Sequence, residues 1–206
     1  MLLSLRWWIA SFVVWCGVST LLSVASVHEA APQAKAPESF DIVSLRLYMT
    51  GDEAIAALRT RFKINPATDL IVGKRPGTYA PKATFIPYVQ YRTNAFSLKI
   101  EFAEVFPLSQ GKREGAYRIS YAMSTKTTAD VDAMKQKAQE KYGAPTTNGP
   151  AGSDVWCDTP CDVLMKPQLE AGPMFDGGFL VYLHDEGFRK RMEEAFNKTK
   201  TGAAPL

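Results

Sequence analysis

The chain has 206 residues, with 24 Lys and Arg against 21 Asp and Glu, and a formal net charge of +3. This length suits one domain of ordinary size once an N-terminal segment is set aside. The slight positive charge argues against nucleic acid as the main partner, because nucleic-acid-binding domains carry clustered Lys and Arg.

The chain opens with one Arg before an uncharged apolar run over residues 7–27. Small residues stand near the end of this run, at Ser23 and Ala25, and the whole pattern is typical of a secretory signal peptide. We therefore predict a signal peptide over residues 1–25, a cut after Ala25, and a periplasmic or secreted protein. The alternative is an uncleaved inner-membrane anchor, because the run is about long enough to cross a hydrocarbon layer of about 30 Å. The chain would then touch the membrane only through this segment.

The first predicted module begins where apolar and polar residues alternate over residues 41–48, which predicts a strand. Thr50 stands three residues before Glu53, and this capping-box spacing predicts a helix that begins near Gly51. The apolar face of this helix consists of Ile55, Leu58 and Phe62, which we expect to be buried.

Proline and glycine residues interrupt any long periodicity over residues 64–82, so we predict a long connection with one short strand at 70–72. Long loops in compact domains are often functional. Lys74, Arg75 and Tyr79 are therefore the residues of a possible partner-binding loop. An ordinary surface loop is the alternative.

Residues 84–91 and 95–106 predict a hairpin, and a strand that begins near Tyr117 extends it into a meander. Thr127 and Thr128 are candidate caps of a second helix, which we expect to end at Gly143. The apolar face of this second helix consists of Val131, Met134, Ala138 and Tyr142. Further strands are predicted over 154–157, 162–166 and 178–184, followed by a docked terminal helix over 185–198.

These elements predict an α+β fold in which helices pack on one face of an antiparallel sheet. After the N-terminal signal helix and a flexible linker over 26–39, we expect a single domain over 40–198 and a tail over 199–206. The order of strand, Thr cap and helix occurs twice, so the domain is predicted to contain two related modules. Their predicted bounds are about 40–122 and 123–184, before the terminal helix.

Two cysteines follow the signal segment, Cys157 and Cys161, and an even pair in an exported chain predicts a disulfide. The closed loop is short, so the bond is expected to stabilise the fold by only about 2 kcal/mol. The spacing is one residue longer than in redox-active C-x-x-C pairs. A metal site would need two further ligands, and the chain offers only His28 and His184.

The predicted domain contains one histidine, His184, and no motif for a nucleophile elbow, a zinc protease or a dinucleotide site. We therefore predict no catalytic, cofactor-binding or metal-binding residues. The expected function is that of a non-catalytic protein-binding or scaffolding domain in the cell envelope, with an unknown protein partner. The alternative from another class is an enzyme with a cryptic site around His184, Asp185 and Trp156.

Two motifs carry a family resemblance. The segment LRLYMTGDEAIAALRTRF resembles the first helical module of the SmpA/OmlA-type (BamE-like) assembly lipoproteins and of beta-lactamase-inhibitor-like domains. The segment EKYGAPTT, followed by a strand with a Trp, is similar to their second module. The resemblance implies a duplicated helix-plus-sheet fold in a non-enzymatic envelope protein that binds another protein through its sheet or loops.

Overall fold

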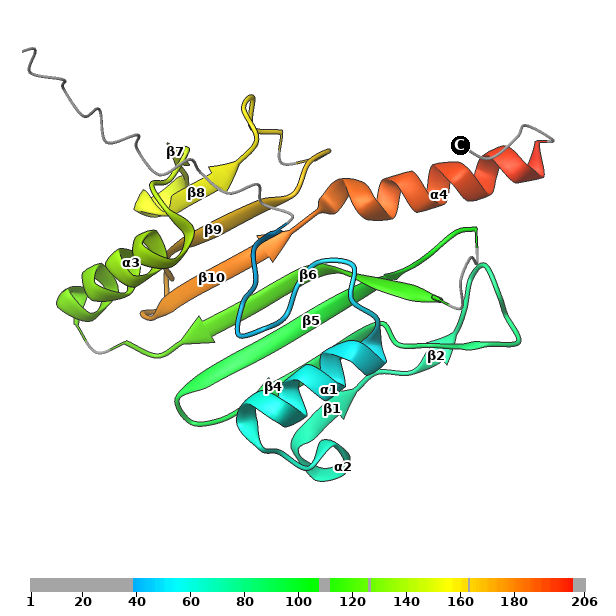
Figure 1. The fold of residues 1–206 in the computed structure, drawn as a ribbon, viewed down its shortest axis with the longest axis horizontal. Coiled ribbons are helices and arrows are strands. Elements are labelled where there is room, and N and C mark those ends of the chain that lie inside the picture. Colours follow the sequence, from blue (N-terminus) through cyan, green and yellow to red (C-terminus); the bar gives the residue numbers. More distant parts are fainter. Residues whose placement is uncertain (1–38, 108–111, 126, 163, 202–206) are drawn as a thin grey trace, which may run out of the picture. The chain divides into compact units, whose positions relative to one another are not determined.

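The computed structural model describes residues 39–107, 112–125, 127–162 and 164–201. The predicted signal segment, nearly all of the linker and most of the tail lie outside these residues. The described residues form an α+β fold around an eight-stranded antiparallel sheet, which confirms the predicted fold class (Figure 1). Within these ranges no helix combines the length and the apolar character needed to cross a membrane.

The bounds of the elements follow. The helices are α1 (Gly51–Phe62), α2 (Pro66–Asp69), α3 (Thr128–Tyr142) and α4 (Glu186–Lys200). The strands of the large sheet, in spatial order, are β1 (Leu70–Val72), β4 (Tyr88–Arg92), β5 (Phe96–Glu104), β6 (Glu114–Met123), β10 (Phe179–His184), β9 (Gln168–Pro173), β8 (Asp154–Cys157) and β7 (Thr147–Asn148). Strands β2 (Arg75–Pro76) and β3 (Thr84–Phe85) pair with each other, and a short 3-10 helix covers Pro150–Gly152.

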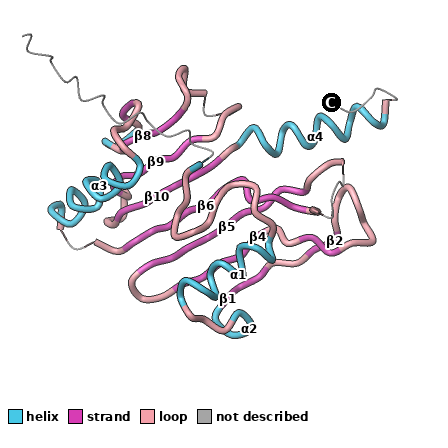
Figure 2. The backbone as a smooth tube through the Cα atoms, in the orientation of Figure 1, coloured by secondary structure: helices cyan, strands magenta, loops and turns pink. Residues whose placement is uncertain are grey.

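Each half of the sheet is formed by consecutive elements of the chain. Helix α1 precedes β1, β4, β5 and β6, and helix α3 precedes β7, β8, β9 and β10. Strands β6 and β10, the last of each series, are neighbours at the middle of the sheet (Figure 2). Each half of the sheet is therefore a meander built from one continuous part of the chain.

Helices α1 and α3 cover the same face of the sheet (Figure 1). Each begins with a capping box, formed by Thr50 with Glu53 and by Thr127 with Asp130, because the local sequence satisfies the first-turn N–H groups. Both helices contribute buried residues to one hydrophobic core, among them Ala54, Leu58, Ala138 and Tyr142. The predictions of both helices and of the Thr50 cap are confirmed.

The predicted strand over residues 41–48 is wrong. Ile42 and Leu45 pair only with each other across a tight turn, in which the Asp41 carboxylate accepts a hydrogen bond from the Ser44 N–H at 3.0 Å. Val43, Ser44 and Tyr48 have positive φ values of 47°, 74° and 65°, which a strand does not allow. Ile42, Leu45 and Leu47 are nevertheless buried. The alternation in the sequence indicated the burial of Leu45 and Leu47 correctly, but Ile42 is buried in place of the half-buried Val43, and no strand forms.

The predicted strand over 162–166 is also wrong, and a strand is formed just after it. Asp162 folds the chain into a turn, because its carboxylate accepts from the Leu164 N–H and its carbonyl accepts from the Lys166 N–H. The strand that follows is β9, which was not predicted, and it ends in Gly172 and Pro173, residues that usually weaken or interrupt a strand. The predicted strands at 154–157 and 178–184 are confirmed as β8 and β10, the latter beginning one residue later.

The terminal helix α4 is confirmed and extends to Lys200. Its first turn docks through Phe188, whose ring lies 5.0 Å from the ring of Tyr48 between centroids. Farther along, the ring of Phe196 lies 4.6 Å from Tyr79 and 5.2 Å from Phe106. The predicted disulfide is confirmed as well: Cys157 and Cys161 are bonded, with Cα atoms 5.4 Å apart.

Candidate functional site

The sheet has a second face, opposite helices α1 and α3, and we call it the open face. Because successive side chains of a strand point to opposite faces, Leu98 and Ile100 of β5 lie in the core while Lys99 and Glu101 lie on the open face. Strand register extends these positions into three cross-strand rows. The central row is Ile71, Gln90, Lys99, Ser120, Tyr182, Glu170 and Val155. The row nearer α4 is Tyr88, Glu101, Arg118, His184, Gln168 and Cys157. The third row is Arg92, Ser97, Ala122, Leu180 and Gly172.

A chain of charged side chains crosses the middle of the open face. Lys99 Nζ lies 2.9 Å from a carboxylate oxygen of Glu101, and Arg118 Nη1 lies 3.1 Å from the other. The same guanidinium donates to Glu186, with Nε at 3.0 Å, and the Tyr182 hydroxyl lies 3.4 Å from that carboxylate. Four elements, β5, β6, β10 and α4, therefore meet in this charged chain.

Burial and neighbouring charges fix the protonation of this cluster. Burial disfavours the charged form of Arg118, but the hydrogen bond to Glu186 and the interactions with Tyr182, Glu186 and Tyr117 together outweigh it and raise the pKa of the guanidinium. Burial likewise opposes ionisation of Glu101, yet the bond from Lys99 and the charges of Lys99 and Arg118 lower the pKa of that carboxyl. Burial raises the pKa of Tyr182. At neutral pH the cluster thus presents fixed ionic groups and a neutral phenol that can donate a hydrogen bond.

His184 lies at the inner end of this cluster and is almost fully buried. Its ring stacks on Tyr182 at 4.4 Å between centroids, and its Nε2 lies 2.8 Å from Gln168 Nε2. Because the Gln168 amide nitrogen can only donate, His184 Nε2 accepts and the proton of the neutral ring sits on Nδ1, which lies 3.8 Å from a Glu186 oxygen. His184 Nδ1 and Gln168 Oε1 have no hydrogen-bond partner among the described residues. Burial lowers the pKa of His184.

This buried histidine gives a pH-dependent contribution to stability. The unfolded chain protonates His184 near its ordinary pKa of about 6.5, whereas the folded protein does so only at lower pH. Stability is therefore lost as the pH falls below about 6.5, since the unfolded state then binds more protons. We expect the free energy of unfolding to drop by about 1 kcal/mol more in the wild type than in His184→Gln between pH 7.5 and 5.5. Urea unfolding at both pH values measures this difference, and equal pH dependence in the two proteins would contradict it.

The predicted loop residues lie away from the open-face cluster. Lys74 is exposed, and the exposed Arg75 has its guanidinium carbon 5.0 Å from the centre of the Phe85 ring. Tyr79 is half-buried between Phe106 and Phe196, where burial raises the pKa of its hydroxyl. Its ring therefore contributes to docking of α4, whereas Lys74 and Arg75 remain open to solvent.

The residues of the alternative enzymatic hypothesis do not share a site. His184 lies on the open face, whereas Trp156 lies on the core face and donates from Nε1 to the Gly143 carbonyl at 2.9 Å. Asp185 is fully buried and accepts from the Tyr48 hydroxyl at 2.6 Å and from Arg191. In the part of the chain that the structure describes, no three His, Cys, Asp or Glu side chains are grouped to hold a metal ion.

Sequence reasoning missed the residues that form the charged cluster. The alternation of Lys99 and Glu101 with buried residues was visible, and it marked them as one face of a strand. Their partners Arg118, Tyr182 and Glu186 come from three other elements, and only the strand register brings them together. Comparisons of the chain with protein-family models, with curated proteins and with solved structures found no match.

Proposed function

We propose that this chain is an exported, non-catalytic protein-binding domain of the cell envelope, and that it binds its partner with the open face of the sheet. The observation that carries the proposal is the half-buried cluster of Lys99, Glu101, Arg118 and Tyr182 on a sheet face opposite both core helices. Arg and Tyr are enriched among the residues that dominate binding energy at protein interfaces. Side chains already held by one another lose little conformational entropy when a partner docks.

The geometry favours binding on the face of the sheet over binding at its edges. A partner strand that extends a sheet needs a long row of free backbone groups. Here the edge strands are short, three residues in β1 and two in β7. The central strands, by contrast, are up to ten residues long and present side chains over their whole length.

Three further parts of the proposal concern the origin and location of the domain. In each half, one helix of 12 or 15 residues is followed by four strands of the large sheet, and this order supports the view that the halves are related modules, as in the families that the sequence resembles. The signal-like N-terminal sequence supports export to the periplasm or the medium, with an inner-membrane anchor as the alternative. The disulfide between Cys157 and Cys161 supports an oxidising compartment.

Site-specific photocrosslinking in the native envelope tests the proposal. A photoreactive phenylalanine derivative at Gln90 or Lys99, on the open face, is expected to give a discrete crosslinked product with a partner protein. The same group at Gln136, an exposed position of α3, is the matched control and is expected to give none. Products from Gln136 alone would contradict the proposal, as would a turnover activity that His184→Ala abolishes.

Arg118→Ala is expected to reduce partner binding about tenfold, because it removes a central Arg of the interface. Arg59→Ala, which removes an exposed Arg from α1, is the matched control and should leave binding unchanged. Binding is measured between the full chain and the purified partner protein that the crosslinking identifies. Equal affinities of the wild type and Arg118→Ala would exclude the charged cluster from the interface.

A further inference from the structure

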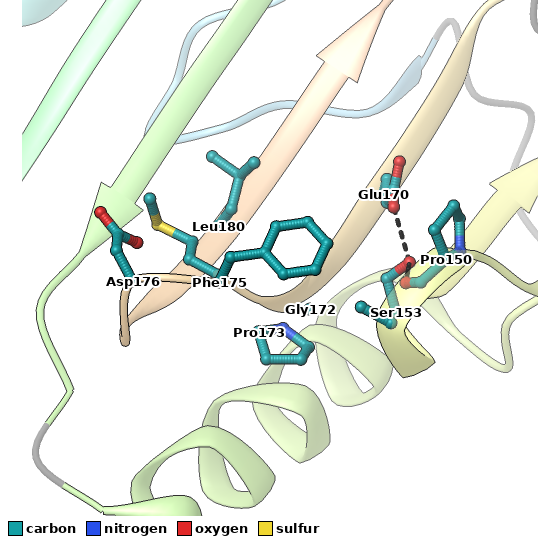
Figure 3. Close-up of a pocket in the computed structure, with 10 residues that line it drawn as sticks. Pro150, Ser153, Glu170, Gly172, Pro173, Phe175, Asp176 and Leu180 are labelled. Atoms are coloured by element: carbon teal, nitrogen blue, oxygen red, sulfur yellow. Dashed lines mark hydrogen bonds between the residues drawn. The ribbon is translucent and has the colours of Figure 1, made fainter.

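The third row of the open face ends in an apolar pocket of about 340 Å³ (Figure 3). Leu180 of β10 and Gly172 of β9, which are paired across the two strands, both line it. Further walls come from Pro150 and from the connection between β9 and β10. The pocket is thus continuous with the face to which we assign partner binding.

Two features of the sequence form this pocket. Gly172 allows the chain around Ser153 to approach closely, because a Cβ atom at position 172 would lie 2.5 Å from Ser153 Cβ. Phe175 occupies the turn after β9 with its side chain fully exposed, at 102% of the reference area. In Figure 3 its ring lies between Leu180 and Ser153, beside the pocket. Covering an exposed Phe and the apolar hollow beside it with another apolar group removes apolar surface from water, which lowers the free energy.

The pocket also has an acidic border. Glu170 and Asp176 both line it, and a carboxylate oxygen of Glu170 accepts a hydrogen bond from the Ser153 hydroxyl at 2.6 Å. Neither carboxylate forms an ion pair with a cation among the residues that the structure describes. An apolar hollow with two unpaired acids is complementary to an apolar group that has positive charges beside it.

We infer that this pocket receives a large apolar side chain of the partner protein, from a segment in which Lys or Arg flanks that residue. The inference rests on the proposed function and specifies the chemistry of the partner. The apolar side chain packs on Leu180, Gly172 and Phe175, while the basic residues face Glu170 and Asp176. The pocket thus selects for an apolar residue with basic neighbours, and the charged cluster binds elsewhere on the same partner.

Selection from a displayed library of random heptapeptides on the full chain tests this inference. We expect enrichment of peptides with Leu, Met, Phe or Trp next to Lys or Arg. The affinity of the most enriched peptide should fall at least fivefold in Phe175→Ala and at least fivefold in the double variant Glu170→Gln, Asp176→Asn. Leu164→Ala, which removes another exposed apolar side chain outside the pocket, and Glu193→Gln are the matched controls and should not change it. Enrichment of acidic peptides or no enrichment would overturn the inference. So would a peptide affinity that is the same in the wild type and in the pocket variants.

The two proposals fail in different ways. Arg118 lies outside the pocket, so Arg118→Ala should leave the peptide affinity unchanged. Peptide binding at the pocket without open-face crosslinks would overturn the proposed function and leave the pocket assignment intact. Crosslinks from Gln90 or Lys99, together with a peptide affinity that Phe175→Ala does not change, would overturn the pocket assignment and leave the proposed function intact.

Discussion

Trp156→Ala is expected to lower the free energy of unfolding by about 3–5 kcal/mol, the largest effect of any single change proposed for this protein. The indole is 1% exposed in the core. Its ring lies 5.7 Å from that of Tyr142, and its N–H donates to the Gly143 carbonyl at the end of α3. Truncation therefore leaves a large cavity and removes a bond that fixes α3 to β8. Urea unfolding followed by far-ultraviolet circular dichroism measures the loss.

Two variants calibrate this result. Trp156→Phe keeps much of the apolar volume but removes the donor to Gly143, so an intermediate loss of about 1–2 kcal/mol is expected. Phe175→Ala removes an aromatic ring that is fully exposed and should change stability by less than about 0.5 kcal/mol. If Trp156→Ala were no less stable than Phe175→Ala, this would contradict the burial of Trp156 in the core.

Asp185→Ala is expected to lower the free energy of unfolding by about 2–4 kcal/mol and to release α4 from the sheet. The Asp185 carboxylate has no solvent exposure and caps α4 by accepting from the Phe188 N–H at 3.1 Å. It also accepts from the Tyr48 hydroxyl and from Arg191. One side chain thus joins the first turn of α4 to the segment before α1. Urea unfolding gives the global loss, and amide hydrogen exchange in α4 gives the local one.

Asp185→Asn separates the two roles of this carboxylate. The amide oxygen can still cap the helix, since Asn is as good an N-cap as Asp, but the charge that pairs with Arg191 is lost. We expect Asp185→Asn to lose less stability than Asp185→Ala. Its α4 amides should also exchange more slowly than those of Asp185→Ala. Unchanged exchange of the α4 amides in Asp185→Ala would show that other contacts, such as Phe188 with Tyr48, suffice to dock the helix.

Features that depend on a few neighbouring residues were predictable from the sequence. The capping box of Thr50 and Glu53 indicated the start of α1, and Thr127, one of two candidate caps, is the N-cap of α3, because each cap involves residues only three positions apart. The disulfide between Cys157 and Cys161 is equally local. The segment 41–48 was mistaken for a strand because alternating burial also arises in an irregular segment packed on a core.

The open face depends on contacts that no local pattern encodes. Arg118 meets Glu101 and Glu186 only because β6 pairs with β5 on one side and with β10 on the other. A shift of one residue in either ladder would move Arg118 to another partner or to the core face. The pocket at Gly172 is similar, since it forms only where β9 pairs with β10 and brings Gly172 next to Leu180.

The pairing of β6 with β10 also has a consequence for the order of folding. Every other ladder of the eight-stranded sheet joins strands that are close in sequence, whereas this one joins residues 118–123 to residues 179–184. The chain between them forms α3 and the other three strands of its half. Contacts between distant residues require the closure of a long loop and form slowly. Each meander can therefore form early by itself, and joining of the two at β6 and β10 is expected to limit the folding rate.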